Sequence, residues 1–331
     1  MPEIIKTNPQ DPLNFYLGDK VFKPHGLSRW VFNRQEQTQN KLGPKEFLQK
    51  MADSGINSLR MVVPGELERG VEPELGKYDA DFLRPTDEVF EIAQSLGIQI
   101  IICLFDHGCF YKPWDPESLE TWNYGIYSTK FPSYKDFLAS QELRKYEKAR
   151  LEFLVSHFNR YSNVFAWEMM NEMNYMGKHF DNTEDVTMDW FSDMAQFVRS
   201  IEPTHMITGS LWGGEIWDSL CAHPLSDFVQ IHTYDEELDP DKNVEVIKKY
   251  VIQTRKYNKP IAITEFASKR GNPRRAEFVE KSLRAAQEVG SSAWLYASVW
   301  DSDADHGMGH GDMNDELFEA YRKTSPSNDH R

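Results

Sequence analysis

Two short stretches of the sequence end in a glutamate after a run of apolar residues. Residues 164–172 read VFAWEMMNE, so Asn171 and Glu172 follow a segment that should be buried, and residues 260–266 read PIAITEF, which places Glu265 in the same way. A carboxylate beside buried apolar residues loses hydration at a free-energy cost, and such carboxylates gather where a site uses them. Glu172 and Glu265 are therefore the first candidates for groups that do chemistry.

The elements that would position these glutamates alternate along the chain. Short β-type runs are separated by helical patterns, which is typical of βα units and a parallel sheet. The expected strands span 21–27, 56–63, 98–105, 164–170, 205–210, 228–234, 260–266 and 292–300, with helices at 44–51, 86–97, about 134–161, 185–201, 240–257 and 274–289. Eight units in 331 residues predict one α/β domain over 1–331, a single (β/α)8 TIM barrel with its core at about 20–322. A doubly wound sheet is the alternative.

In such a barrel the chemistry lies at the carboxyl ends of the strands. The side chains expected there are Arg60, His107, Asn171 with Glu172, His232 with Tyr234, Glu265 and Trp300. Any one of them could merely cap a strand or form a salt bridge, but a series of such ends indicates a shared site. Glu172 and Glu265 fall on strands four and seven, which face each other across the barrel mouth. Their carboxyl groups could approach to about 5–5.5 Å, a separation at which one protonates a leaving oxygen and the other attacks an anomeric carbon.

The order of these strand ends resembles a known group of enzymes. N-E after strand four, H-x-Y on strand six, T-E on strand seven and a Trp closing strand eight resemble the clan of (β/α)8 glycoside hydrolases that carries its two glutamates on strands four and seven. Arg60 and His107 match the pattern of family 5, the cellulase and mannanase family, and the resemblance covers about residues 20–322. Met173 departs from this pattern, because many members carry Pro after N-E.

The resemblance implies a retaining β-glycoside hydrolase that needs no cofactor. Glu172 would be the acid/base and Glu265 the nucleophile of a double displacement. Asn171 would bind the 2-hydroxyl of the sugar, while Arg60 and Tyr234 would keep Glu265 ionised, because a cation and a hydroxyl donor both favour the carboxylate.

The same resemblance assigns the remaining residues to substrate binding. His107 and His232 would line the subsite of the reacting sugar, and Trp300 would form an apolar floor beneath it. The expected substrate is β-mannan, manno-oligosaccharides or a related β-1,4-linked glycan. The alternatives are an exo-acting β-glucosidase or β-glucanase and a transglycosylase of the same clan.

A long aromatic loop, residues 106–133, follows the third expected strand. It is far longer than a usual βα connection. Its rings could pack on one another or form sugar-stacking subsites, and Trp114 and Trp122 are the candidates for the second role. Trp212, after strand five, is a further candidate wall of the cleft.

Residues 301–312, DSDADHGMGHGD, raise the possibility of a metal site. Their spacing fits no EF-hand loop and the sequence contains no H-E-x-x-H, so a solvated loop is the preferred interpretation and no metal is expected. A metal-dependent barrel hydrolase and a non-enzymatic sugar-binding barrel are the two alternatives from other functional classes.

The bulk properties restrict the partners. A net charge of −15 argues against nucleic acid and anionic membranes, and no apolar run approaches the roughly 20 residues that span a bilayer. Cys103, Cys109 and Cys221 show no metal-binding spacing, and an odd count disfavours a disulfide framework. An oligo- or polysaccharide is the expected partner. The expected location is cytoplasmic, or secreted if a leader has been removed, and the oligomeric state is left open.

Overall fold

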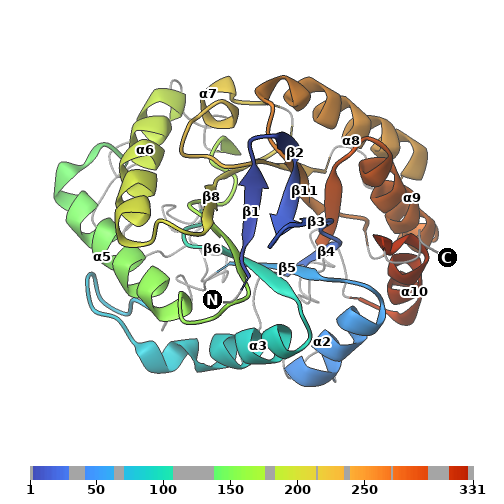
Figure 1. The fold of residues 1–331 in the computed structure, drawn as a ribbon, viewed down its shortest axis with the longest axis horizontal. Helices are drawn as coiled ribbons and strands as arrows, with labels where there is room; N and C mark the ends of the chain where they lie inside the picture. Colours follow the sequence, from blue (N-terminus) through green and yellow to red (C-terminus); the bar gives the residue numbers. More distant parts are fainter. Residues whose placement is uncertain are drawn as a thin grey trace, which may run out of the picture.

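The computed structural model describes residues 3–29, 42–62, 71–106, 138–175, 183–213, 215–234, 239–269, 271–296 and 313–326. Helices form a ring around a central parallel sheet in the view along the barrel (Figure 1). The strands of this sheet are β4 (Gly26–Ser28), β5 (Ser58–Val62), β6 (Gln99–Cys103), β7 (Val164–Glu168), β8 (Met206–Thr208), β9 (Ser210–Leu211), β10 (Val229–Thr233), β11 (Ile261–Phe266) and β12 (Ser292–Tyr296).

The sheet closes on itself. Its strand order is β8-β7-β6-β5-β4-β12-β11-β10-β9, and β8 and β9 are consecutive pieces of one stretch of chain, separated only by Gly209. A Cβ on Gly209 would lie 2.3 Å from the sulfur of Met173, so a side chain at this break would have to displace the Met173 side chain. The (β/α)8 barrel is confirmed, with its fifth strand in two pieces.

The helices of the repeating units cover the outside of the barrel. They are α2 (Pro44–Asp53), α3 (Arg84–Ser95), α5 (Gln141–Phe158), α6 (Thr183–Ile201), α7 (Asp218–Cys221), α8 (Pro240–Thr254), α9 (Arg275–Glu288) and α10 (Asp315–Thr324). Helix α5 begins later than the expected 134, because the hydroxyl of Ser140 accepts a hydrogen bond from the amide of Leu143 and caps the helix there. None of the described helices combines the length and apolar character needed to cross a bilayer.

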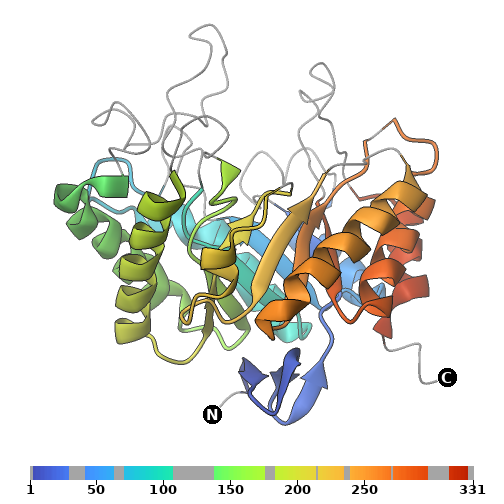
Figure 2. The same ribbon diagram turned by 90° about the horizontal axis from the view of Figure 1, so that it is seen from above.

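A small antiparallel sheet precedes the barrel and was not expected. It consists of β1 (Ile5–Asn8), β2 (Asp11–Leu17) and β3 (Lys20–Phe22), and it lies beneath the barrel in Figure 2, where it covers the amino ends of the strands. Phe15 packs edge-on against Phe165 and Phe228 of the barrel, at 5.2 and 5.3 Å between ring centroids. The sheet therefore closes this end of the barrel with an apolar contact.

The expected first strand at 21–27 is wrong. Lys20–Phe22 belongs to the antiparallel sheet, and the first barrel strand is the three-residue segment Gly26–Ser28. Pro24 separates the two, because proline has no backbone N–H for a sheet ladder and ends the run.

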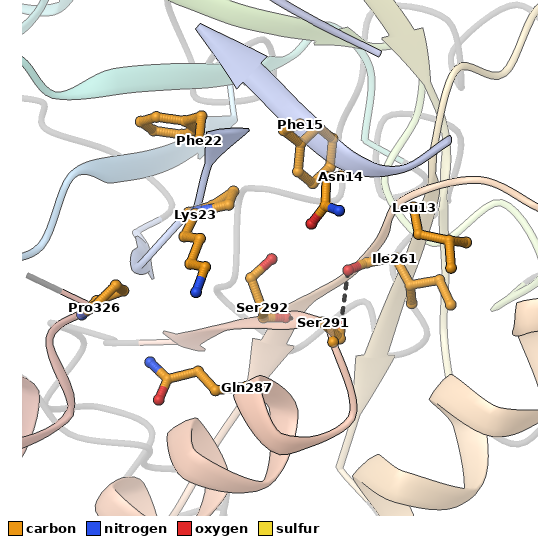
Figure 3. A pocket seen from close by; sticks show the side chains of 12 residues that line it. Leu13, Asn14, Phe15, Phe22, Lys23, Ile261, Gln287, Ser291, Ser292 and Pro326 are labelled. Carbon is orange, nitrogen blue, oxygen red and sulfur yellow. Dashed lines mark hydrogen bonds between the residues drawn. The ribbon is translucent and has the colours of Figure 1, made fainter. Parts of the chain in front are cut away.

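A cavity of about 290 Å³ lies between the small sheet and the barrel. Figure 3 shows Phe15 and Phe22 of the sheet on one side, with Ile261, Ser291 and Ser292 of the barrel opposite. Ile261 and Ser292 are the first residues of β11 and β12. The cavity is thus at the amino end of the barrel, away from the carboxyl ends of the strands.

Candidate active site

Glu172 and Glu265 lie close together at the carboxyl end of the barrel. Glu265 is on β11, whereas Glu172 is in a turn that follows β7. Strand β7 ends at Glu168, two residues before the expected end at residue 170. One oxygen of each carboxyl group and one ring nitrogen of His232 all lie within 4.8 Å of one another. Glu172 and Glu265 are 7% and 6% exposed. Two carboxyl groups that differ by 93 positions in sequence therefore share one buried site.

Arg60, on β5, is the cation that contacts Glu265. Its Nη1 donates a hydrogen bond to Oε1 of Glu265, and the hydroxyl of Tyr234 donates to Oε2. A third carboxylate, Glu168, accepts hydrogen bonds from Nε and Nη2 of Arg60 at 2.6 and 2.7 Å. Burial alone would lower the pKa of Arg60, but Glu168 and Glu265 outweigh this and hold the pKa well above its usual value. Arg60 is therefore a fixed positive charge.

The surroundings of Glu172 favour its protonated form. Burial raises the pKa of Glu172 well above its usual range, and the negative charges of Glu265 and Asp106 raise it further. Its Oε1 lies 2.8 Å from Nδ1 of His232. Burial also raises the pKa of Glu265, but Arg60 and the Tyr234 hydroxyl oppose that rise. The two carboxyl groups therefore stand in different electrostatic settings, with a proton favoured on Glu172.

The amide of Asn171 is held at both ends. Nη2 of Arg60 donates to its oxygen at 2.8 Å, and its nitrogen donates to Oδ2 of Asp106 at 2.7 Å. The donor Arg60 and the acceptor Asp106 therefore determine which end of the amide is the oxygen and which is the nitrogen. Asn171 and Asp106 also form a parallel bridge, so the turn after β7 is aligned with the end of β6.

A comparison with protein families identifies this barrel. The model described as cellulase (glycosyl hydrolase family 5) matches residues 20–303. The chain belongs to glycosyl hydrolase family 5. The expected membership of this family is therefore confirmed.

Relatives of this family 5 chain include enzymes named for mannan. Mannan endo-1,4-beta-mannosidase 2 of Arabidopsis thaliana is 24% identical over 229 residues, which are 58% of this chain and 52% of that protein. The chain spans about half the length of the first curated relatives it matches, 52% and 49%.

Solved structures share the fold. The glycoside hydrolase family 5 mannosidase from Rhizomucor miehei superposes with a TM-score of 0.73 at 14% identity, covering 98% of both chains. The endo-beta-1,4-mannanase from Thermotoga petrophila gives a TM-score of 0.72 at 17% identity and covers 92% of this chain and 77% of that one. At these identities the comparison shows that the folds are alike.

Three site residues of this family 5 barrel were missed from the sequence. Glu168 forms an ion pair with Arg60, and Asp106 accepts a hydrogen bond from the side-chain amide of Asn171. The hydroxyl of Ser210 accepts a hydrogen bond from the backbone N–H of Glu172 at 2.8 Å. Glu168 carried a signal, because it is a charged residue inside the apolar run VFAWEMMNE. Asp106 and Ser210 are ordinary polar residues near strand ends, and no sequence pattern singles them out.

Several expected substrate-binding residues cannot be placed beside this centre. His107, Trp114, Trp122 and Trp300 lie outside the described residues, as do Cys109, most of the aromatic loop and the segment 301–312. Trp212 is described. It follows β9, is partly buried, and its ring lies edge-on to Tyr175 with centroids 6.2 Å apart.

The group Glu172, His232 and Glu265 has the side chains of a metal site. However, each oxygen of Glu265 already receives a hydrogen bond, one from Arg60 and one from Tyr234. A divalent ion bound to Glu265 would stand beside the buried guanidinium of Arg60 and be repelled by it. The donors around Glu265 thus fit a carboxylate that is balanced by Arg60 better than a metal ligand.

Proposed function

We propose that this family 5 protein is a retaining glycoside hydrolase that cleaves β-1,4 bonds in β-mannan or manno-oligosaccharides. The observation that carries the proposal is the approach of the Glu172 and Glu265 oxygens to within 4.8 Å. Retaining glycosidases use carboxyl groups about 5–5.5 Å apart, whereas inverting ones need about 6.5–9.5 Å to admit a water molecule. The short separation therefore supports double displacement.

In the first step, Glu265 attacks the anomeric carbon and Glu172 gives its proton to the oxygen of the leaving sugar. The bond to the leaving group breaks as a glycosyl–enzyme ester forms on Glu265. The contacts of Arg60 and Tyr234 with Glu265 keep this carboxylate charged and oriented. The raised pKa of Glu172 supplies an acid at near-neutral pH.

In the second step, Glu172 has lost its proton and acts as the base. It takes a proton from a water molecule that attacks the anomeric carbon, and the ester to Glu265 breaks. Ionisation of Glu172 becomes easier once Glu265 is esterified, because the neighbouring negative charge that raised its pKa is gone. Glu172 therefore acts as an acid while Glu265 is a charged carboxylate, and as a base while Glu265 is an ester.

Asn171 is proposed to bind the 2-hydroxyl of the reacting sugar. Arg60 and Asp106 hold its amide in one orientation, so it meets the substrate without rearranging. His232 lies beside both carboxyl groups, at 2.8 and 3.6 Å, which suits a wall of the same subsite. His107, Trp114, Trp122, Trp212 and Trp300 remain proposed sugar-binding residues.

The choice of mannan is supported by the relatives. The curated proteins with significant similarity include mannan endo-1,4-beta-mannosidases of Arabidopsis thaliana and Oryza sativa. Mannose differs from glucose at one hydroxyl, so a substrate panel tests this choice directly. We expect β-mannan and manno-oligosaccharides to be cleaved faster than cellulose, cello-oligosaccharides and aryl β-glucosides. Faster cleavage of the glucans would overturn the proposed sugar. Product lengths then distinguish endo from exo cleavage.

The mechanism is tested on the same substrates. The first product should have β configuration by NMR, because two inversions restore it. Glu265→Ala should lower kcat by about 10⁴-fold or more, and azide should partly restore turnover with an α-configured product. An α-configured product from the unaltered protein, or near-normal turnover by Glu265→Ala, would contradict the double displacement. Unchanged activity in the presence of a chelator separates this mechanism from the metal-dependent alternative.

A further inference from the structure

Ser210 of β9 makes three hydrogen bonds to the turn that carries Glu172. The backbone N–H of Ser210 donates to the carbonyl of Met170 at 3.3 Å, and its carbonyl accepts the N–H of Met173 at 2.9 Å. Its hydroxyl accepts the N–H of Glu172 at 2.8 Å. Ser210 is fully buried, so these bonds are shielded from water.

A second residue of the same turn continues this connection. The side-chain oxygen of Asn174 accepts the N–H of Trp212 at 2.6 Å. Its side-chain nitrogen donates to the carbonyls of Trp212 and Glu215, both at 2.8 Å. Asn174 is 3% exposed. We name the hydrogen bonds of Ser210 and Asn174 the clasp, because together they join the turn after β7 to β9 and to the residues that follow β9.

Glu172 needs such support because its backbone is strained. It has a φ of 47°, and Asn258, at 56°, is the other non-glycine residue with a positive φ in the described part of the chain. Asn tolerates this region, whereas a glutamate adopts it only when its surroundings impose it. The amide hydrogen of Glu172 points to the Ser210 hydroxyl in this conformation, and so the clasp acts at the strained residue itself.

We infer that Ser210 and Asn174 are positioning residues that hold the strained Glu172 turn in the orientation needed for proton transfer. This inference depends on the proposed function, since it concerns the acid/base. Ser210 reaches both members of the N-E pair, because its hydroxyl also lies 3.5 Å from the side-chain oxygen of Asn171. Asn174 binds the backbone of Trp212, and so the proposed cleft wall and the acid move as one unit.

The test compares leaving groups. Aryl β-mannosides with poor leaving groups need a proton from Glu172. In 2,4-dinitrophenyl β-mannoside the dinitrophenolate is a good leaving group and departs without protonation. We expect Ser210→Ala to lower kcat/KM for the poor leaving groups by up to about 100-fold, because a misplacement of about 1 Å has that effect. The value for the activated substrate should change little. Ser210→Thr, which keeps the hydroxyl, should recover most of the loss.

Asn174→Ala provides a second variant if Ser210→Ala folds poorly. We expect the same dependence on leaving group. The KM for oligosaccharides should also rise, because the backbone of Trp212 loses two hydrogen bonds to Asn174 and that of Glu215 loses one. Ser292→Ala is the matched control. It removes another buried serine hydroxyl, at the cavity of Figure 3, and should leave the leaving-group dependence unchanged.

Glu172→Gln separates failure of the inference from failure of the proposed function. If Glu172→Gln itself slows all leaving groups equally, the acid/base assignment is wrong. If Glu172→Gln shows the expected dependence but Ser210→Ala and Asn174→Ala slow both classes of substrate alike, or neither, the clasp does not position the acid. A loss of melting temperature with unchanged leaving-group dependence would likewise overturn the inference.

Discussion

Arg60 has more negative charge around it than one guanidinium can balance. It contacts Glu168 and Glu265 directly, and Asp106 and Glu172 bring two more carboxyl groups to the same buried centre. Burying several carboxylates is unfavourable unless they are paired, so one of them should hold a proton. Glu172 is the group for which burial and like charge combine most strongly.

The charge of Glu265 is one cause of the raised pKa of Glu172, and this can be tested. In Glu265→Gln the negative neighbour is removed while burial stays the same, so the pKa of Glu172 should fall toward its usual value. ¹³C NMR of labelled glutamate carboxyl groups measures both titrations. Val21→Ala, a change in the small sheet, serves as the control. A pKa of Glu172 that stays the same or rises in Glu265→Gln would show that the charge of Glu265 does not contribute to the raised pKa.

The sequence identifies single site residues better than it identifies their contacts. Glu172 and Glu265 stand out because each ends an apolar run, which is a local feature. Glu168 pairs with Arg60 across 108 positions, and only the register of the barrel strands decides that these two residues meet. The positive φ of Glu172 is also invisible in sequence, because glutamate has no preference for that conformation.

At the scale of elements, β4 and β12 are in unusually close contact. A Cβ built on Gly26 of β4 would lie 1.7 Å from Nε1 of Trp294 of β12, and Trp294 is fully buried. The indole therefore occupies the space of the missing side chain. This contact joins the first and last strands of the barrel, which are separated by almost the whole sequence.

Gly26→Ala should therefore destabilise the barrel. The added methyl group forces a rigid indole to move, and overpacking of this kind costs about 1–3 kcal/mol of unfolding free energy or more. Urea denaturation measures the loss. Gly271→Ala is the matched control, since a Cβ there meets nothing within 4 Å and the change should stay within about 0.5 kcal/mol. Equal effects of the two substitutions would contradict the packing argument.

The barrel elements could be predicted because their signal is local. Each βα unit repeats an apolar run and an amphipathic helix, and the run at 98–105 lies on a strand that is buried throughout. The antiparallel sheet at residues 5–22 gives no such signal. Only Phe15 of the seven residues of β2 is buried, so neither a continuous apolar run nor a clear alternation marks this strand.

For the molecule as a whole, the two ends of the barrel have different tasks. The carboxyl ends of the strands hold the glutamates, whereas the amino ends carry the small sheet and an apolar cluster that includes Ile5, Phe15, Phe165 and Trp294. In barrels of this type the carboxyl end is the place of chemistry and the amino end contributes stability. Substitutions at the two ends should therefore change different measured quantities.

Phe15→Ala tests this division. Phe15 is 4% exposed and contacts two barrel phenylalanines, so its removal should lower the free energy of unfolding by about 3–5 kcal/mol. Below the melting transition, kcat/KM on manno-oligosaccharides should stay the same, because the site is at the opposite end. Val21→Ala changes a residue of the same sheet that is 46% exposed, and should alter stability by less than about 0.5 kcal/mol. If Phe15→Ala lowered kcat/KM while leaving the free energy of unfolding intact, the small sheet would be coupled to the site and would not simply close the barrel.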